Sequence, residues 1–159
     1  MKNLAYLFLI SLIIGMSSCS EDNQSIEELE ESTFIFGSYN GFCQGNCAHL
    51  FKYENGEVFR DEMDRFDDSN LTFSSSSEND LVDVAKRLFS EFPEFLKESN
   101  QETYGCPGCL DQSTLYVRIG EGSSSQSWRL DSIEQEDWPR ELKEYVKLLK
   151  TELEQIIVF

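Results

Sequence analysis

Four cysteines stand in two close pairs, and they are the residues best able to do chemistry in this sequence. Cys43 and Cys47 form a C-x3-C pair, and Cys106 and Cys109 form a C-x2-C pair. Outside the cytoplasm, such pairs form disulfides first, and four cysteines allow three connectivities. A long-range link would stabilise the fold more, but proximity and the Gly-rich turns favour local bonds. We therefore expect two structural disulfides, Cys43–Cys47 and Cys106–Cys109.

Two other chemistries fit the same cysteines. Cys106-Pro107-Gly108-Cys109 has the spacing of a thioredoxin-type redox motif, but that chemistry needs the first cysteine at a helix N-terminus, and here a strand is expected to follow. A zinc site is the second alternative, and a compact zinc ribbon would need a shorter gap than the one between the pairs. Its ligands would come from Cys43, Cys47, His49, Cys106 and Cys109. We expect neither a metal nor a cofactor, and His49 is then a side chain on the surface of a sheet.

Other catalytic patterns are missing from the sequence. His49 is the only histidine, and there is no Walker loop, no dinucleotide-binding glycine pattern and no His-Glu-x-x-His. The acidic run Asp64, Asp67 and Asp68 lacks the EF-hand spacing and glycine, so a solvated acidic loop is expected there rather than a Ca²⁺ site. The sequence therefore predicts a protein that is not an enzyme.

The first 18 residues have the composition of a secretory leader. Lys2 supplies a positive charge, and the 13 residues from Leu4 to Met16 are apolar except for Ser11. The apolar run is short for a membrane-spanning helix. No acidic residue precedes Glu21, and acidic residues are frequent after it. We expect residues 1–18 to be a signal peptide that is cleaved before Cys19.

The cleavage region is Gly15-Met16-Ser17-Ser18-Cys19. Small residues give a peptidase access to the backbone, and a thiol can take a lipid. This arrangement resembles the lipobox of bacterial lipoproteins, with Met16 where leucine is commoner. The resemblance implies a diacylglyceryl thioether on Cys19 and acylation of the new amine, and two or three acyl chains anchor a protein durably. The alternative is an ordinary secreted protein with a free thiol at Cys19.

Residues 19–32 are expected to be a lipidated acidic tether. They contain no basic residue, and Ser20-Glu21-Asp22 follows the cysteine directly. This resembles the tether of surface lipoproteins in Bacteroidota-type envelopes, and the Gly/Cys loop and the Cys-Pro-x-Cys turn are similar to those of small lipoproteins of that kind. The resemblance implies an outer-membrane lipid anchor on the periplasmic or cell-surface side, because Ser20 argues against inner-membrane retention. It implies no particular activity.

The charge balance limits the possible partners. The chain of 159 residues has 13 basic and 30 acidic residues, a formal net charge of −17. Cleavage before Cys19 would remove Lys2 and leave −18. Such a charge repels nucleic acid and favours a protein with a basic surface. We expect a non-enzymatic binding or accessory module of the envelope, and the alternative is an acidic inhibitor or immunity-type protein against a cationic enzyme.

Residues 33–159 are long enough for one domain. Strands are expected at 33–38, 49–53 and 57–60, and the last two form a hairpin around Asn55-Gly56. For that hairpin we expect a three-residue loop that pairs Phe51 with Phe59, because it joins aromatic residues and separates Glu54 from Glu57. Residues 67–80 are expected to be a loop.

The second half alternates between helical and strand patterns. Ser77 is expected to cap a helix whose apolar face ends near Phe92, where Pro93 interrupts it. Alternating residues predict a strand at 115–119 and a return strand at 128–130, and Asp137 is expected to cap a last helix with an apolar stripe from Leu142 to Ile156. The predicted class is α+β: an antiparallel sheet of about five strands with two amphipathic helices on one face. A ferredoxin-like split arrangement is the alternative.

Overall fold

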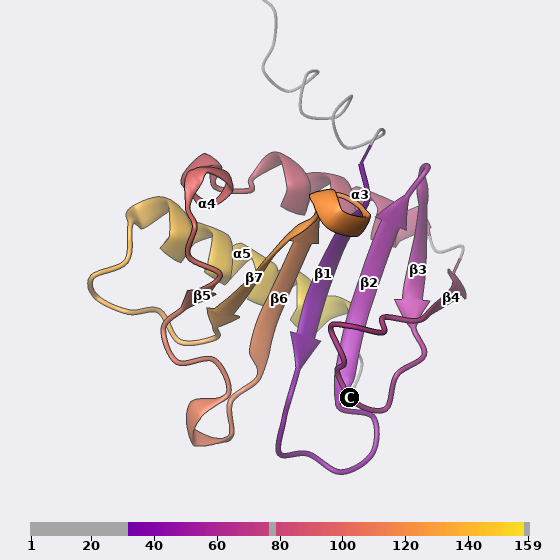
Figure 1. Cartoon of the computed structure of the whole chain (residues 1–159), viewed down its shortest axis with the longest axis horizontal. Coiled ribbons are helices and arrows are strands. Elements are labelled where there is room, and N and C mark those ends of the chain that lie inside the picture. The colour runs from indigo at the N-terminus through magenta and orange to yellow at the C-terminus, as the bar shows by residue number, and fades with distance from the viewer. Residues whose placement is uncertain (1–31, 77–78, 158–159) are drawn as a thin grey trace, which may run out of the picture.

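A computed structural model describes residues 32–76 and 79–157 of the chain. The leader, Cys19 and the expected cap at Ser77 lie outside the described residues. The α+β class is confirmed, with helices layered on one face of a single sheet (Figure 1). The elements in chain order are β1 (Phe34–Tyr39), β2 (Ala48–Glu54), β3 (Glu57–Asp61), β4 (Phe73–Ser76), α3 (Asn79–Ser90), α4 (Glu94–Glu98), β5 (Thr103–Tyr104), the short 3-10 helix η1 (Cys109–Asp111), β6 (Thr114–Ile119), the 3-10 helix η2 (Gly122–Ser124), β7 (Gln126–Asp131) and α5 (Arg140–Ile156).

The described sheet has seven strands rather than about five, in the order β4-β3-β2-β1-β6-β7-β5. Neighbouring strands are antiparallel, except that β5 runs parallel to β7. The two strands that the sequence did not predict are the edge strands: β4 lies inside the expected loop 67–80, and β5 has only two residues. The serine-rich β4 is held by pairing to β3 rather than by its own strand propensity, and β5 is too short to give a pattern. The element order is also not that of a ferredoxin-like fold.

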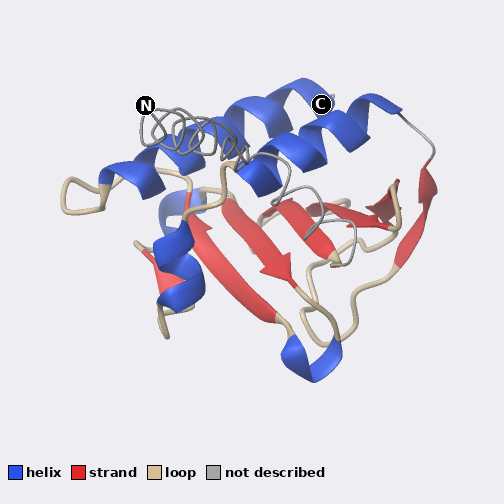
Figure 2. Cartoon of the chain, turned by 90° about the horizontal axis from the view of Figure 1, so that it is seen from above, coloured by secondary structure: helices blue, strands red, loops and turns tan. Residues whose placement is uncertain are grey.

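The core lies between the sheet and the helices (Figure 2). The expected apolar faces of α3 and α5 are buried there, and they meet a sheet face that is rich in aromatic residues, including Phe34, Phe36 and Trp128. Pro93 does interrupt the first helix, and the chain continues in a separate short helix, α4. The last helix begins after Pro139, which occupies the N-cap position, so the expectation that Asp137 caps it was wrong.

The β2–β3 hairpin has the shorter loop. Phe51 pairs with Arg60 and Glu54 pairs with Glu57, so the predicted pairing of Phe51 with Phe59 was wrong. Asn55 and Gly56 both have positive φ, 52° and 82°, which is the geometry of a two-residue hairpin turn. This register places Val58 in the core. Phe59 lies on the other face of the sheet, where the Lys52 Nζ is 4.8 Å from the centroid of its ring. The repulsion between the two glutamates is tolerated because Lys52 binds Glu54 at 3.0 Å.

The second face of the sheet carries a smaller apolar cluster, which packs against side chains of the β3–β4 loop, residues 62–72. Asp68 holds this loop to the sheet: its carboxylate lies 2.6 Å from the Arg129 guanidinium and 3.8 Å from that of Arg118, and it accepts the Tyr116 hydroxyl. Burial and the Asp68 carboxylate raise the pKa of Tyr116. Asp68 is therefore a structural anchor, which corrects the expectation that this acidic run is simply solvated.

Within the described residues, no helix combines the length and the apolar character that crossing a membrane would require.

Candidate functional site

The two cysteine pairs form local disulfides, Cys43–Cys47 in the β1–β2 loop and Cys106–Cys109 between β5 and β6. Of the three possible connectivities, the structure has the local one. Both loops follow strand ends at the same end of the sheet, and the Asn40 side chain donates to the Asp111 carbonyl at 3.4 Å. The disulfides therefore close two neighbouring loops at one end of the molecule.

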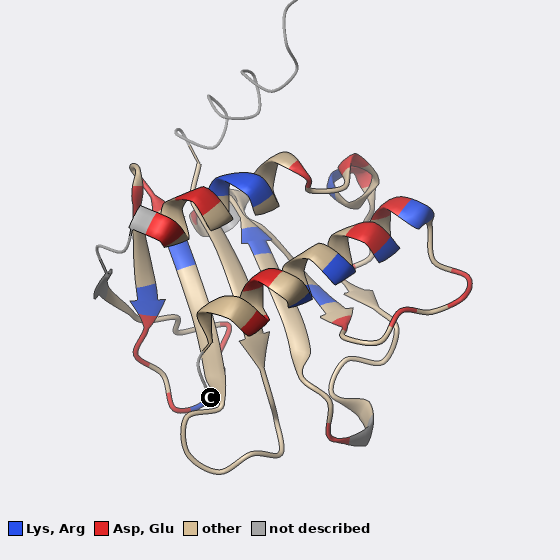
Figure 3. Cartoon of the chain, turned by 180° about the vertical axis from the view of Figure 1, so that it is seen from behind, with Lys and Arg blue, Asp and Glu red and all other residues tan. Residues whose placement is uncertain are grey.

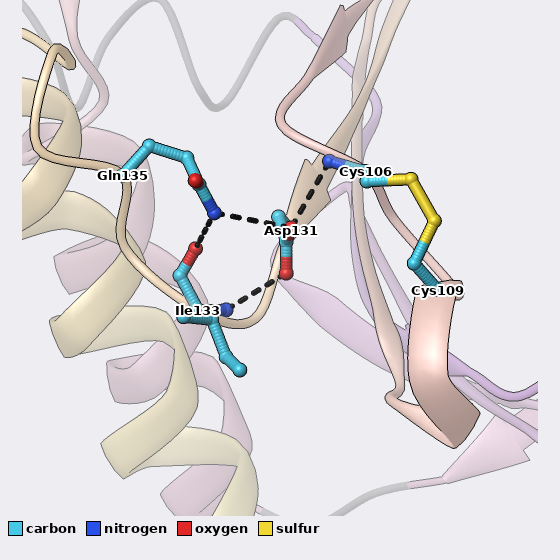
Figure 4. The surroundings of a disulfide bond; sticks show 5 residues. All are labelled: Cys106, Cys109, Asp131, Ile133 and Gln135. Carbon is cyan, nitrogen blue, oxygen red and sulfur yellow. Dashed lines mark hydrogen bonds between the residues drawn. A yellow bond between two sulfur atoms is a disulfide. The ribbon is translucent and has the colours of Figure 1, made fainter.

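A buried carboxylate supports the second disulfide (Figure 4). Asp131, at the end of β7, is 4% exposed. One of its oxygens accepts the Cys106 backbone N–H at 3.0 Å and the Gln135 amide at 3.4 Å, and the other accepts the Ile133 N–H at 2.9 Å. Gly105 is needed beside it, because a Cβ there would lie 2.6 Å from the Asp131 Cβ. The carboxylate thus fastens the disulfide loop to the sheet.

The surroundings of the Cys106–Cys109 bond favour a structural disulfide over a catalytic one. Cys106 is an exposed residue. The Asp131 carboxylate accepts the Cys106 backbone N–H, and a negative group beside this residue disfavours the thiolate that exchange chemistry needs. The motif leads only into the three-residue η1 and then into β6, so it lacks the helix N-terminus that would lower a thiol pKa.

The zinc alternative has no cluster to support it. Within residues 32–76 and 79–157, no three His, Cys, Asp or Glu side chains are grouped so that they could hold a metal ion. His49 lines a small recess beside β2 and β3 together with Asp61, and neither cysteine of the second pair lines it. Burial raises the pKa of the Asp61 carboxyl, while the N–H of Leu50, which donates to it at 2.8 Å, and the nearby His49 act in the opposite direction.

A groove of about 470 Å³ lies between the α3–α4 segment and α5, and we call it the helical groove. Pro93 creates one wall, since it ends the first helix and turns the chain into α4. Residues one or two turns apart on α5 form the other wall, as i, i+3 and i+4 spacing places them on one face. The groove is lined by Arg87, Ser90, Glu91, Phe92, Pro93, Glu94, Glu141, Glu144, Tyr145 and Leu148.

The two walls carry four carboxylates and one basic side chain. Acidic residues are visible on both helical segments when the molecule is seen from behind (Figure 3). The basic residue, Arg87, is bound at 2.9 Å by Glu152, a buried residue of α5 outside the groove. The helical groove is therefore negatively charged along its length, with apolar groups at its base.

No protein-family model, no curated protein and no solved structure matches this chain.

The cysteines could be identified from the sequence, but the groups that position and surround them could not. Asp131 ends a strand, and in the sequence it resembles the many acidic residues that are exposed, so only its burial distinguishes it. The helical groove was equally hidden, because its walls come from segments some 50 residues apart. The one available signal was Pro93, which predicted the break between helices that opens the groove.

Proposed function

We propose that this protein is a lipid-anchored lipoprotein of a bacterial outer membrane, on the periplasmic or cell-surface side, and that it is a non-enzymatic binding module for a protein with a basic surface. The observation that carries the proposal is the pairing of all four domain cysteines in disulfides. Disulfides are typical of exported proteins. The fifth cysteine, Cys19, follows the expected leader and is the one to which lipid would be attached.

The binding role is supported by charge. The formal net charge of −17 makes association with a cationic protein fast and sensitive to salt. The negatively charged helical groove adds a concave surface on which such a partner can dock. An inhibitor or immunity-type protein against a cationic enzyme is the more specific form of the same function.

The anchor is tested by labelling cells with radioactive palmitate. Wild-type protein is expected to incorporate label, and Cys19→Ser is expected to abolish it. The double variant Cys43→Ser/Cys47→Ser is the matched control and is expected to keep the label. Thiol counting on the purified protein is expected to find no free thiol in the domain. Labelling that survives in Cys19→Ser, or four reduced cysteines, would contradict the proposed export and anchoring.

Binding is tested with lysozyme as a cationic probe. We expect the purified protein to bind it at low ionic strength and to lose most of that affinity as salt is added, because the attraction is screened. Inhibition of lysozyme under the same conditions would support the inhibitor form. Affinity that is absent, or that does not change with salt, would contradict electrostatic binding.

A further inference from the structure

The helical groove contains carboxylates that the protein's own basic residues leave unused. Glu144 is paired with Arg140 at 2.7 Å, and Glu94 is paired with Lys97 at 3.4 Å. Glu91 and Glu141 stand on opposite walls, both are exposed, and neither has an ion-pair partner within the described part of the chain. Two free carboxylates thus face a groove whose single basic residue is already bound elsewhere.

The base of the groove adds an independent feature. Tyr145 lines the groove and is 1% exposed, and its ring packs edge-on against Phe92 with centroids 5.3 Å apart. Its hydroxyl is buried and has no hydrogen-bond partner among the described residues. An unsatisfied buried hydroxyl destabilises the fold, so a ligand group that reached this hydroxyl from the groove would gain a hydrogen bond that the free protein lacks.

We propose that the helical groove binds an arginine or lysine side chain of a protein partner. This inference rests on the proposed binding function and names its site. Glu91 and Glu141 neutralise the cationic head, and Leu148, Phe92 and Pro93 pack against the apolar stem. The Tyr145 hydroxyl accepts a hydrogen bond from the cation once small side-chain movements admit it.

The chemistry of the groove selects a long basic side chain over other ligands. A divalent metal needs several oxygen ligands at close range, and the described carboxylates do not form such a group. An anion would be repelled by the four glutamates. A basic side chain separates its charge from its backbone by a flexible stem, so it can reach carboxylates along an open groove.

The test uses a hexa-arginine peptide and calorimetric titration of the purified protein. Glu91→Gln/Glu141→Gln removes the two free carboxylates of the groove. Glu57→Gln/Glu62→Gln is the matched control, because it removes the same charge from exposed residues at the β3 end of the sheet. We expect the groove variant to lose at least about tenfold in affinity and the control to lose less than about twofold.

Tyr145→Phe separates a role of the hydroxyl in binding from a structural role, because affinity and melting temperature are measured on the same variant. The variant deletes only the unpartnered hydroxyl, so we expect the free protein to have an equal or higher melting temperature. We expect its affinity for hexa-arginine to fall several-fold. A gain in stability together with a loss of affinity would assign the hydroxyl to the ligand, and unchanged affinity would remove it from the site.

The outcomes separate the groove from the function on which it rests. Equal losses in the two double variants would overturn the groove proposal and attribute binding to net charge alone. Salt-sensitive binding of lysozyme without binding of hexa-arginine would overturn the groove and keep the proposed function. Failure to bind either probe would contradict both, whatever the palmitate result.

Discussion

Asp131 supports the Cys106–Cys109 loop, and its replacement should have a graded effect. In Asp131→Asn, an NH₂ group replaces one of the two carboxylate oxygens. The remaining oxygen can accept a hydrogen bond from the N–H of Cys106 or from that of Ile133, but not from both. Asp131→Ala accepts neither. A hydrogen bond to a charged acceptor contributes about 1.5 to 3 kcal/mol. Because Cys106 is exposed to water, we take the lower value for each bond.

The expected loss of unfolding free energy is then about 1.5 kcal/mol for Asp131→Asn and about 3 kcal/mol for Asp131→Ala. With a urea m-value of about 2 kcal/mol/M, the unfolding midpoints should fall by about 0.75 M and about 1.5 M. The disulfide should also become more accessible to reductant as its loop detaches. Urea unfolding followed by tryptophan fluorescence measures the first effect, and the rate of thiol release in dithiothreitol measures the second.

Asp137→Asn is the control, since this exposed residue precedes α5 and makes no side-chain hydrogen bond among the described residues. Its midpoint and its rate of thiol release should match those of the wild type. If Asp131→Asn and Asp131→Ala unfold together with the wild type, the buried carboxylate does not stabilise the loop. If they are equally destabilised, the loss comes from the charge or the cavity and the count of hydrogen bonds is wrong.

Three further perturbations test the sheet and its loop. Gly37→Ala places a Cβ against the backbone oxygen of His49 in β2, so we expect a loss of about 3 kcal/mol in unfolding free energy. The control Gly41→Ala, whose Cβ meets nothing within 4 Å, should unfold like the wild type. Asp68→Ala releases the β3–β4 loop from its arginines and should speed trypsin cleavage after the exposed Arg65, measured by mass spectrometry; an unchanged rate would refute the anchoring role. Because the pKa of the Asp61 carboxyl is raised, the folded state keeps its proton to higher pH than the unfolded state. The unfolding free energy should therefore fall as pH rises through the range just above the ordinary pKa of 3.8. Asp61→Asn should remove that contribution, so the difference in melting temperature between the variant and the wild type should change between pH 3 and 7. A difference that stays constant over this range would refute the reasoning.

The elements with their own periodicity could be predicted from the sequence. The helices α3 and α5 each bury one repeating face, and the strands β1, β2, β6 and β7 are rich in apolar and aromatic residues, so their patterns are visible without knowledge of their neighbours. The edge strands could not be predicted in this way. The sequence of β4 has the composition of a serine-rich loop, and this segment forms a strand only because β3 offers a free edge.

The hairpin register shows how a local rule failed. Pairing two aromatic residues and separating two glutamates both favoured the longer loop, yet the shorter turn places Tyr53 and Val58 together in the core. Burial of an apolar pair outweighs the repulsion between exposed carboxylates, which is weak in water. The roles of Asp68 and Asp131 were hidden for a related reason, since each depends on groups that are far away in the sequence.

Net charge and the helical groove should act on different steps of binding. Several of the chain's basic residues are bound by its own acids, so the unpaired glutamates and aspartates set the field that a partner meets. At physiological salt that field decays over about 8 Å, so it changes how fast a cationic partner arrives. A carboxylate pair that contacts the bound side chain instead sets how long the partner stays. In stopped-flow measurements, Glu57→Gln/Glu62→Gln should therefore slow association slightly, whereas Glu91→Gln/Glu141→Gln should mainly speed dissociation. If both variants changed association alone, the groove would act only through its charge, and no basic side chain would be held in it.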